Sequence, residues 1–156
     1  MAGFCGTAGL SLCPGRCYSF YVGTSVDNGR TGVNLLLHPF GVEYRDTIGG
    51  FVDGRFFGVS GAGFVIQDFS GFLALGVAGE MGLFMGYRAF NQQDDSSYHK
   101  VSSSFVVRAE PSIKPFIRVP SGREGWAVEM WTGYGWPSDK QLGAGLLLGL
   151  PEFKDY

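Results

Sequence analysis

Residues 69–90 read FSGFLALGVAGEMGLFMGYRAF, and two kinds of side chain alternate along this stretch. The odd positions carry the large apolar residues: Leu73, Leu75, Val77, Met81, Leu83, Met85 and Tyr87. The even positions carry small or charged residues: Ala74, Gly76, Ala78, Glu80, Gly82, Gly86 and Arg88. A period of two is the signature of an extended strand with two different faces. A run of this length, with glycine opposite the apolar face, is typical of a membrane-spanning β-strand.

Similar alternation covers much of the remaining chain. The shorter runs lie at 17–26, 31–37, 40–45, 98–110, 113–119, 126–136 and 142–150. Residues 27–30 read DNGR and predict a tight turn, 91–97 predict a polar loop, and Pro111 with Ser112 predicts another turn. The alternation slips by one residue at His38 and Pro39, which indicates a bulge or a corner.

These runs predict an all-β fold, a closed antiparallel up-and-down β-barrel of about eight strands. The length of 156 residues suits a single domain, 1–156, in which we expect 1–16 to be an irregular N-terminal segment. The chain is glycine-rich, with 26 glycines, and only 17% of its residues are charged. A net charge of −2 gives no concentration of positive potential, so nucleic acid is not an expected partner.

The apolar face of the strands could point either outward or into the barrel, and the composition of the small-residue face favours the outward orientation. Exposed glycine weakens a strand, whereas small residues suit the crowded interior of a narrow barrel. We therefore expect the apolar face to contact membrane lipid. The residues assigned to this lipid-facing set are Leu73, Leu75, Val77, Leu83 and Met85. Two alternatives stay open: a soluble barrel or sandwich with the apolar set inside, and a helical membrane subunit in which 69–90 is a transmembrane helix.

Many charged residues share the parity of the small-residue face in their own strands. The expected interior charge network comprises Glu43, Arg45, Glu80, Arg88, Lys100, Arg108, Glu110 and Glu129. Lys114 and Arg118 have the same parity in their run. Because an unpaired interior charge costs several kcal/mol, these groups are expected to neutralise one another.

From Cys17 to Leu150 the chain resembles the small eight-stranded outer-membrane barrels of Gram-negative bacteria, the class of the OmpA transmembrane domain. The resemblance rests on the strand pattern and not on a specific motif. It implies a bacterial outer-membrane location, and Tyr156 matches the terminal aromatic residue of that class, although Glu152 and Lys154 depart from its pattern. Residues 1–12 lack the basic start of a secretory signal, so this location requires a processed form of the chain.

The sequence offers little chemistry for catalysis. Some barrels of this class modify lipids, and His99 with Ser103 is the weak candidate for a catalytic pair, since the two share a face on a regular strand. Cys5, Cys13 and Cys17 lack the spacing of a metal site, and Cys13 and Cys17 flank a short turn that a disulfide would close. We expect no metal and no cofactor.

The preferred interpretation is a non-enzymatic outer-membrane barrel with a structural or adhesive role, or one in passage of small solutes, without a large open pore. Its expected partners are membrane lipid and other proteins or a second copy of itself. The alternative is a soluble barrel or sandwich, secreted or cytoplasmic, that binds an apolar ligand or a partner protein. A lipid-modifying outer-membrane enzyme is the third interpretation.

Overall fold

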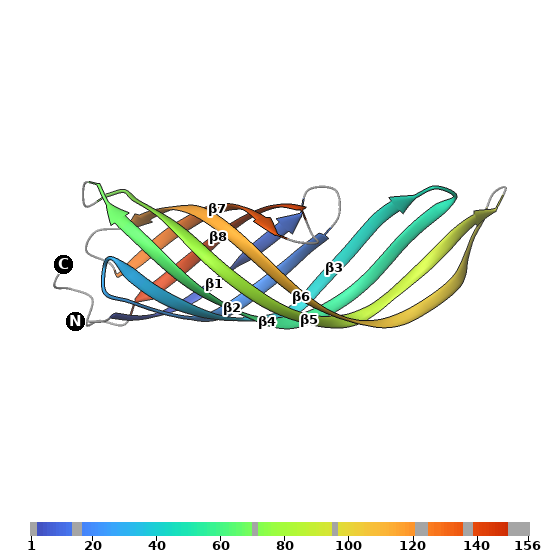
Figure 1. The fold of residues 1–156 in the computed structure, drawn as a ribbon, viewed down its shortest axis with the longest axis horizontal. Coiled ribbons are helices and arrows are strands. Elements are labelled where there is room, and N and C mark those ends of the chain that lie inside the picture. The colour runs from blue at the N-terminus through green and yellow to red at the C-terminus, as the bar shows by residue number, and fades with distance from the viewer. Residues whose placement is uncertain are drawn as a thin grey trace.

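The computed structural model describes residues 3–13, 17–69, 72–94, 97–120, 125–135 and 139–149. Eight antiparallel strands close into a barrel in sequence order, with β1 paired to β8 (Figure 1). The strands are β1 (Gly3–Cys13), β2 (Cys17–Asp27), β3 (Thr31–Thr47), β4 (Gly50–Asp68), β5 (Ala74–Asp94), β6 (Ser97–Pro120), β7 (Trp126–Gly135) and β8 (Asp139–Gly149). The predicted all-β closed barrel of about eight strands is confirmed.

The expectation of an irregular segment at 1–16 is wrong for its described part, because Gly3–Cys13 forms the regular strand β1. Residues 3–13 read GFCGTAGLSLC, and the glycines and small polar residues at both parities obscure the alternation of apolar and polar side chains that marks a strand. The strand is stabilised by its neighbours, because β1 forms hydrogen-bonded ladders with β2 and with β8 and so closes the barrel. Cys13 and Cys17 are register partners at the end of the β1–β2 ladder.

The alternating stretch 69–90 forms β5 from Ala74 onward, so the transmembrane-helix alternative is wrong. The even positions of β5 face the barrel interior and the odd positions face outward, as the burial pattern of the strand shows. Among the described residues, no helix is long and apolar enough to cross a membrane.

Strands β5 and β6 include two segments that the sequence predicts as a turn and a loop. Strand β6 runs unbroken from Ser97 to Pro120, so Pro111 and Ser112 lie inside the strand. The predicted polar loop at 91–97 is mostly strand as well, because β5 continues to Asp94 and pairs with Ser97. A proline is tolerated inside a strand when its missing N–H does not belong to a ladder hydrogen bond.

The other local predictions hold. Gly29 has a φ of 81° in the turn between β2 and β3, and the Asn28 side chain accepts hydrogen bonds from the backbone N–H of Arg30 and Thr31. Gly49, with a φ of 82°, turns the chain between β3 and β4. The phase slip at Pro39 is a register shift in the β3–β4 ladder between His38 and Gly41.

The strands differ in length, and this difference shapes the molecule. β1, β2, β7 and β8 have 10 or 11 residues, whereas β3, β4, β5 and β6 have 17 to 24. The long strands are neighbours, so their ends leave the barrel together as one four-stranded sheet, called here the projecting sheet (Figure 1, right). The opposite end of the barrel carries the start of β1 and the end of β8.

Candidate functional site

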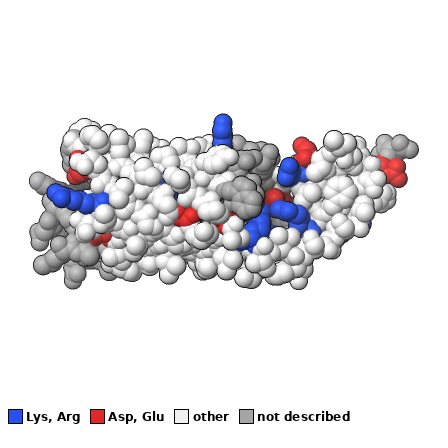
Figure 2. Space-filling view, viewed as in Figure 1, with Lys and Arg blue, Asp and Glu red and all other residues white. Residues whose placement is uncertain are grey.

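The outer wall of the barrel is apolar. Leu75, Val77 and Leu83 are 39%, 47% and 45% exposed on β5, and the outward residues of the other strands include Leu35, Val65, Ile113 and Leu146. Met85 faces the same way and is partly buried, whereas Leu73 precedes β5 and its carbonyl accepts a hydrogen bond from Phe69. Figure 2 shows a largely uncharged wall, with basic side chains gathered where the projecting sheet leaves the barrel.

The height of this wall matches a bilayer. On β5 the outward residues are apolar from Leu75 to Tyr87. At about 3.3 Å per residue and a tilt of about 40°, this segment rises roughly 30 Å along the barrel axis, close to the thickness of a hydrocarbon core. Tyr87 packs edge-on against Phe105 with the ring centroids 5.3 Å apart, at the level where an aromatic belt lies in outer-membrane barrels.

Charged side chains fill the interior in pairs along β6. At the end away from the projecting sheet, Arg118 donates to Asp27 over 3.1 Å and to Glu129 over 3.0 Å. The guanidinium also lies over the rings of Phe64 and Phe116. In this cluster one cation pairs with two carboxylates.

Midway along the barrel, Lys114 and Glu80 form the most buried pair. Their Nζ and Oε1 atoms are 2.7 Å apart, and both side chains are below 10% exposed. The ammonium also lies 4.2 Å from the ring centroid of Trp131. A cavity of about 30 Å³ lies beside this pair, and the unpartnered polar atoms His38 Nδ1 and Asn34 Oδ1 line it. Such a cavity holds one or two water molecules and not a solute.

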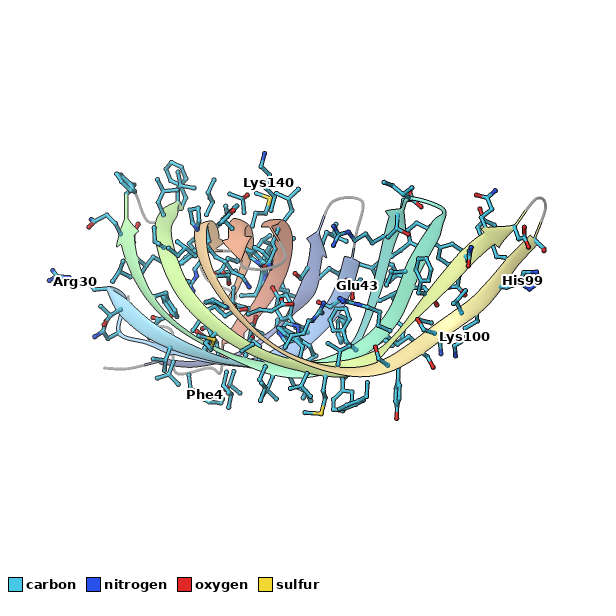
Figure 3. All side chains as sticks on the ribbon, turned by 45° about the vertical axis from the view of Figure 1, so that its right-hand side comes forward. Phe4, Arg30, Glu43, His99, Lys100 and Lys140 are labelled. Atoms are coloured by element: carbon cyan, nitrogen blue, oxygen red, sulfur yellow. The ribbon has the colours of Figure 1, made fainter. Side chains whose placement is uncertain are left out.

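The third cluster lies where the interior opens toward the projecting sheet (Figure 3, Glu43 labelled). Both carboxylate oxygens of Glu43 accept hydrogen bonds from Arg88 at 2.8 Å, and Arg108 reaches the same carboxylate at 3.2 Å. Arg108 also contacts Glu110 at 3.2 Å. Two arginines and two glutamates therefore balance one another at the mouth of the barrel.

The structure thus brings together six of the eight residues assigned to the interior network, namely Glu43, Glu80, Arg88, Arg108, Glu110 and Glu129, together with Lys114 and Arg118. Arg45 and Lys100 lie elsewhere, since both are exposed on the projecting sheet. Asp27 was missed because it was assigned to a turn. The alternation from Ser25 to Asp27 places it inside and was the signal that could have found it.

Large side chains share the interior with the ion pairs, which the sequence analysis did not expect. Tyr21, Leu36, Phe64, Phe116 and Trp131 form a buried cluster with Ala62 and Ala78. Phe84 is buried on the inner face of β5, between Gly82 and Gly86. These residues close the lumen between the charged clusters.

The candidate catalytic pair does not form. The β5–β6 register shifts at Val101, so His99 pairs with Gln92 while Ser103 pairs with Ala89. Gln92 and Ala89 lie on opposite faces of β5, and their partners therefore do too. The His99 ring is instead 2.9 Å from the Ser97 hydroxyl. Among the described residues, no group of three His, Cys, Asp or Glu side chains could hold a metal ion.

The outer face of the projecting sheet carries an aromatic row beyond the apolar wall. Tyr44 stacks on Phe51 with the centroids 5.3 Å apart, and Phe51 meets Tyr98 edge-on at 5.0 Å. Tyr44 donates its hydroxyl to Asp46 over 2.9 Å, and this bond raises the pKa of the phenol. The row ties β3, β4 and β6 together across β5.

No protein-family model matches the chain, and no curated protein matches it in sequence. Among solved structures, the N-terminal β-barrel domain of Pseudomonas aeruginosa OprF is similar, with a TM-score of 0.53 and 13% identity over 96% of this chain and 97% of that one. The chain has the fold of the small eight-stranded outer-membrane barrels. The resemblance drawn from the strand pattern is confirmed at the level of the fold.

Ail, the attachment invasion locus protein of Yersinia pestis, is also similar, with a TM-score of 0.48 and 11% identity over 94% of this chain and 92% of that one. A second structure of Ail, in complex with the heparin analogue sucrose octasulfate, has a TM-score of 0.42, with 10% identity over 94% of this chain and 92% of that one.

Proposed function

We propose that this chain is a bacterial outer-membrane barrel with a structural or adhesive role, which presents the projecting sheet at the cell surface and has no large open pore. The observation that supports the proposal is that the apolar and charged side chains are distributed in the opposite way to those of a water-soluble protein. Apolar side chains such as Leu75, Val77 and Leu83 cover the outside, while ion pairs occupy the inside. Such a surface is stable in hydrocarbon and would aggregate in water.

The closed interior favours a structural or adhesive role over passage of solutes. The cavities near Lys114 and near Glu43 measure about 30 and 10 Å³, and aromatic rings and ion pairs lie between them. The projecting sheet is then the part of the chain that is available to a partner, because the wall is covered by lipid.

The experiment that tests the membrane location introduces one arginine at the middle of the outer wall and, in a second variant, one arginine on the projecting sheet. Met81 is 56% exposed on the outer wall midway between Leu75 and Tyr87, whereas Ser103 is exposed on the outer face of the projecting sheet. We expect Met81→Arg to cost about 2–4 kcal/mol of folding free energy in liposomes and Ser103→Arg to cost about nothing, because arginine is costly only at the bilayer midplane.

The readout is the fraction of protein that migrates as a compact band on a denaturing gel without boiling. Loss of that band for Met81→Arg, with wild-type behaviour of Ser103→Arg, supports the proposal. Equal yields of the compact band for both variants, or folding of the wild type in buffer without detergent or lipid, would contradict it.

A further inference from the structure

The outer face of the projecting sheet changes in composition above the apolar wall. The wall on β5 ends at Tyr87, and Asn91 is the second outward residue beyond it, roughly 10 Å higher along the barrel axis. The register partners of Asn91 are Phe51 on β4 and Lys100 on β6, which therefore lie on the same outer face (Figure 3, Lys100 labelled). Aromatic and polar side chains thus follow the aliphatic ones of the wall.

The aromatic row described above supplies ring surface at this level. Tyr44 and Tyr98 are 47% and 58% exposed, and the ring of Phe51 lies between them and contacts both. The face of an aromatic ring is electrostatically negative, so it attracts the polarised C–H groups that line the flat side of a hexose. The row can therefore stack against a sugar ring.

Hydrogen-bonding groups border the aromatic row. Asp46 accepts the Tyr44 hydroxyl over 2.9 Å, and Asp53 accepts a hydrogen bond from the side-chain amide of Asn91. A carboxylate has about four lone-pair sites, so both aspartates keep acceptors after these bonds, and Asn91 keeps its carbonyl and a second N–H. The two bonds hold these groups in place before a ligand binds. Saccharide hydroxyls donate as well as accept, so they match such a mixed set.

The charges on this face balance one another. Arg55 lies on the outer face as the register partner of Tyr87, one outward step below Asp53, and is exposed. Together Arg55 and Lys100 carry two positive charges, and Asp46 and Asp53 carry two negative ones. A face without net charge gives no long-range attraction to an anion. It favours a polar ligand without charge over a phosphate or a sulfate.

The patch is continuous with the wall that lipid covers. Tyr44 and Asp53 are register partners one outward step above the Val42–Arg55 pair, and Arg55 pairs with Tyr87 at the aromatic belt. A lipid whose acyl chains lie along the wall therefore has its headgroup against this face. A saccharide from solution would have to displace those headgroups, so the surrounding leaflet is the favoured source of the ligand.

We propose that the outer face of the projecting sheet binds the uncharged saccharide headgroup of a glycolipid in the surrounding leaflet. The residues of this saccharide patch are Tyr44, Phe51, Asp53, Asn91, Tyr98 and Lys100. Hexose rings stack on the exposed aromatic surface, while hydroxyls donate to Asp53 and accept from Asn91 and Lys100. This inference rests on the proposed function, since it requires the wall to lie in lipid.

The test titrates digalactosyl diacylglycerol, whose saccharide headgroup is uncharged, into the full chain in micelles of a sugar-free detergent. Native mass spectrometry counts the bound lipid. Asp53→Ala removes hydrogen-bond acceptors and Tyr98→Ala removes an exposed ring. Ser103→Ala is the matched control, because Ser103 lies in the same outward cross-strand row as Asp53 but on β6, outside the patch. We expect Asp53→Ala to weaken binding about tenfold, Tyr98→Ala about threefold or more, and Ser103→Ala by less than about twofold.

Two further ligands, tested on the wild type, keep the experiment independent of the fold of the variants. Phosphatidylglycerol with the same acyl chains has an anionic headgroup without a sugar ring, and digalactosyl glycerol has the saccharide without acyl chains. Both are expected to bind about tenfold more weakly than the galactolipid. Equal binding of phosphatidylglycerol would show an unselective lipid surface, and equal binding of digalactosyl glycerol would assign the patch to a soluble saccharide. Either result would overturn the proposal.

The remaining outcomes separate this inference from the proposed function. Variants Asp53→Ala and Tyr98→Ala that give the compact unboiled band and bind the galactolipid as the wild type does would refute the saccharide patch. A wild type that inserts into liposomes and shows no preference for the galactolipid would also refute it, and would leave the proposed function in place.

Discussion

At the scale of single residues, the interior glycines make room for aromatic rings. A side chain at Gly76 would occupy the place of the Phe116 ring, and one at Gly143 would occupy that of Trp131. The sequence alone predicts only that these glycines are small enough for the interior of a narrow barrel. In the structure each of these glycines leaves room for one particular aromatic ring, Phe116 at Gly76 and Trp131 at Gly143.

Two glycines of β5 give a matched test of this role. Gly76 faces inward against Phe116, whereas Gly79 faces outward with no atom near the position of an added methyl group. We expect Gly76→Ala to destabilise the folded barrel by about 1–3 kcal/mol through overpacking, and Gly79→Ala to be neutral or to stabilise it by up to about 1 kcal/mol. Urea unfolding in liposomes measures both, and a larger cost at Gly79 would contradict the assigned faces.

The Lys114–Glu80 pair predicts a non-additive double mutant. Lys114→Met leaves the carboxylate of Glu80 buried without its cation and is expected to cost about 3–5 kcal/mol. Adding Glu80→Leu removes the orphaned charge, so the double variant is expected to recover most of the loss. The unfolding free energies of the wild type, both single variants and the double variant check this. A double variant as unstable as the sum of the two single changes would show that the pair does not act as a unit.

At the scale of elements, the long strands divide into a part that closes the barrel and a part that projects beyond it. β5 and β6 continue for several residues past the Tyr87–Phe105 contact, and on their outer face polar residues such as Asn91 and Lys100 replace the aliphatic ones. The projecting part is held by its own ladders and by the aromatic row from Tyr44 to Tyr98.

The barrel should therefore fold without the tip of the β5–β6 hairpin. We expect replacement of 91–101 by Asn-Gly, which joins the Phe90–Ser102 pair through a two-residue turn, to leave the compact unboiled band and insertion into liposomes unchanged. Failure of this shortened chain to insert would mean that the tip stabilises the barrel itself.

Much of the fold could be predicted from the sequence, because a strand whose two faces meet different surroundings shows alternating apolar and polar or small residues. The strand at 69–90, the turn at Gly29 and the bulge at His38 all gave such signals. The turn expected at Pro111 failed for a physical reason. In general proline breaks a strand, but here its missing N–H points away from the ladder with β5, toward the side on which β6 pairs with β7 only from Ser112 onward.

The candidate site was less predictable, because register is a property of two strands. His99 and Ser103 share a face on any regular strand, and only the shift against β5 at Val101 separates them. The interior charges were found by parity within single strands, but which cation meets which anion depends on strands far apart in the chain, as for Arg88 and Glu43. Lys100 was misplaced for the same reason as His99.

At the scale of the whole molecule, the filled lumen predicts the absence of large conductance. Beside the ion pairs and the cluster around Trp131, the cavities near Lys114 and near Glu43 measure about 30 and 10 Å³, which is the size of one or two water molecules. We expect planar-bilayer recordings of the purified protein to show no stable channels of nanosiemens size, because eight strands enclose a space that side chains fill. Stable openings of that size from a monomer would contradict the closed interior.

The central claim is that the bulky apolar residues of β5 contact lipid while the alternate residues face a polar interior. The most direct test is a nitroxide scan of residues 75–87 in liposomes, with oxygen as the probe that partitions into hydrocarbon. The account predicts high oxygen accessibility at the odd positions, highest near Met81, and low accessibility at the even ones. High accessibility at Glu80 and Gly82 with protection at Leu75, Val77 and Leu83 would contradict it.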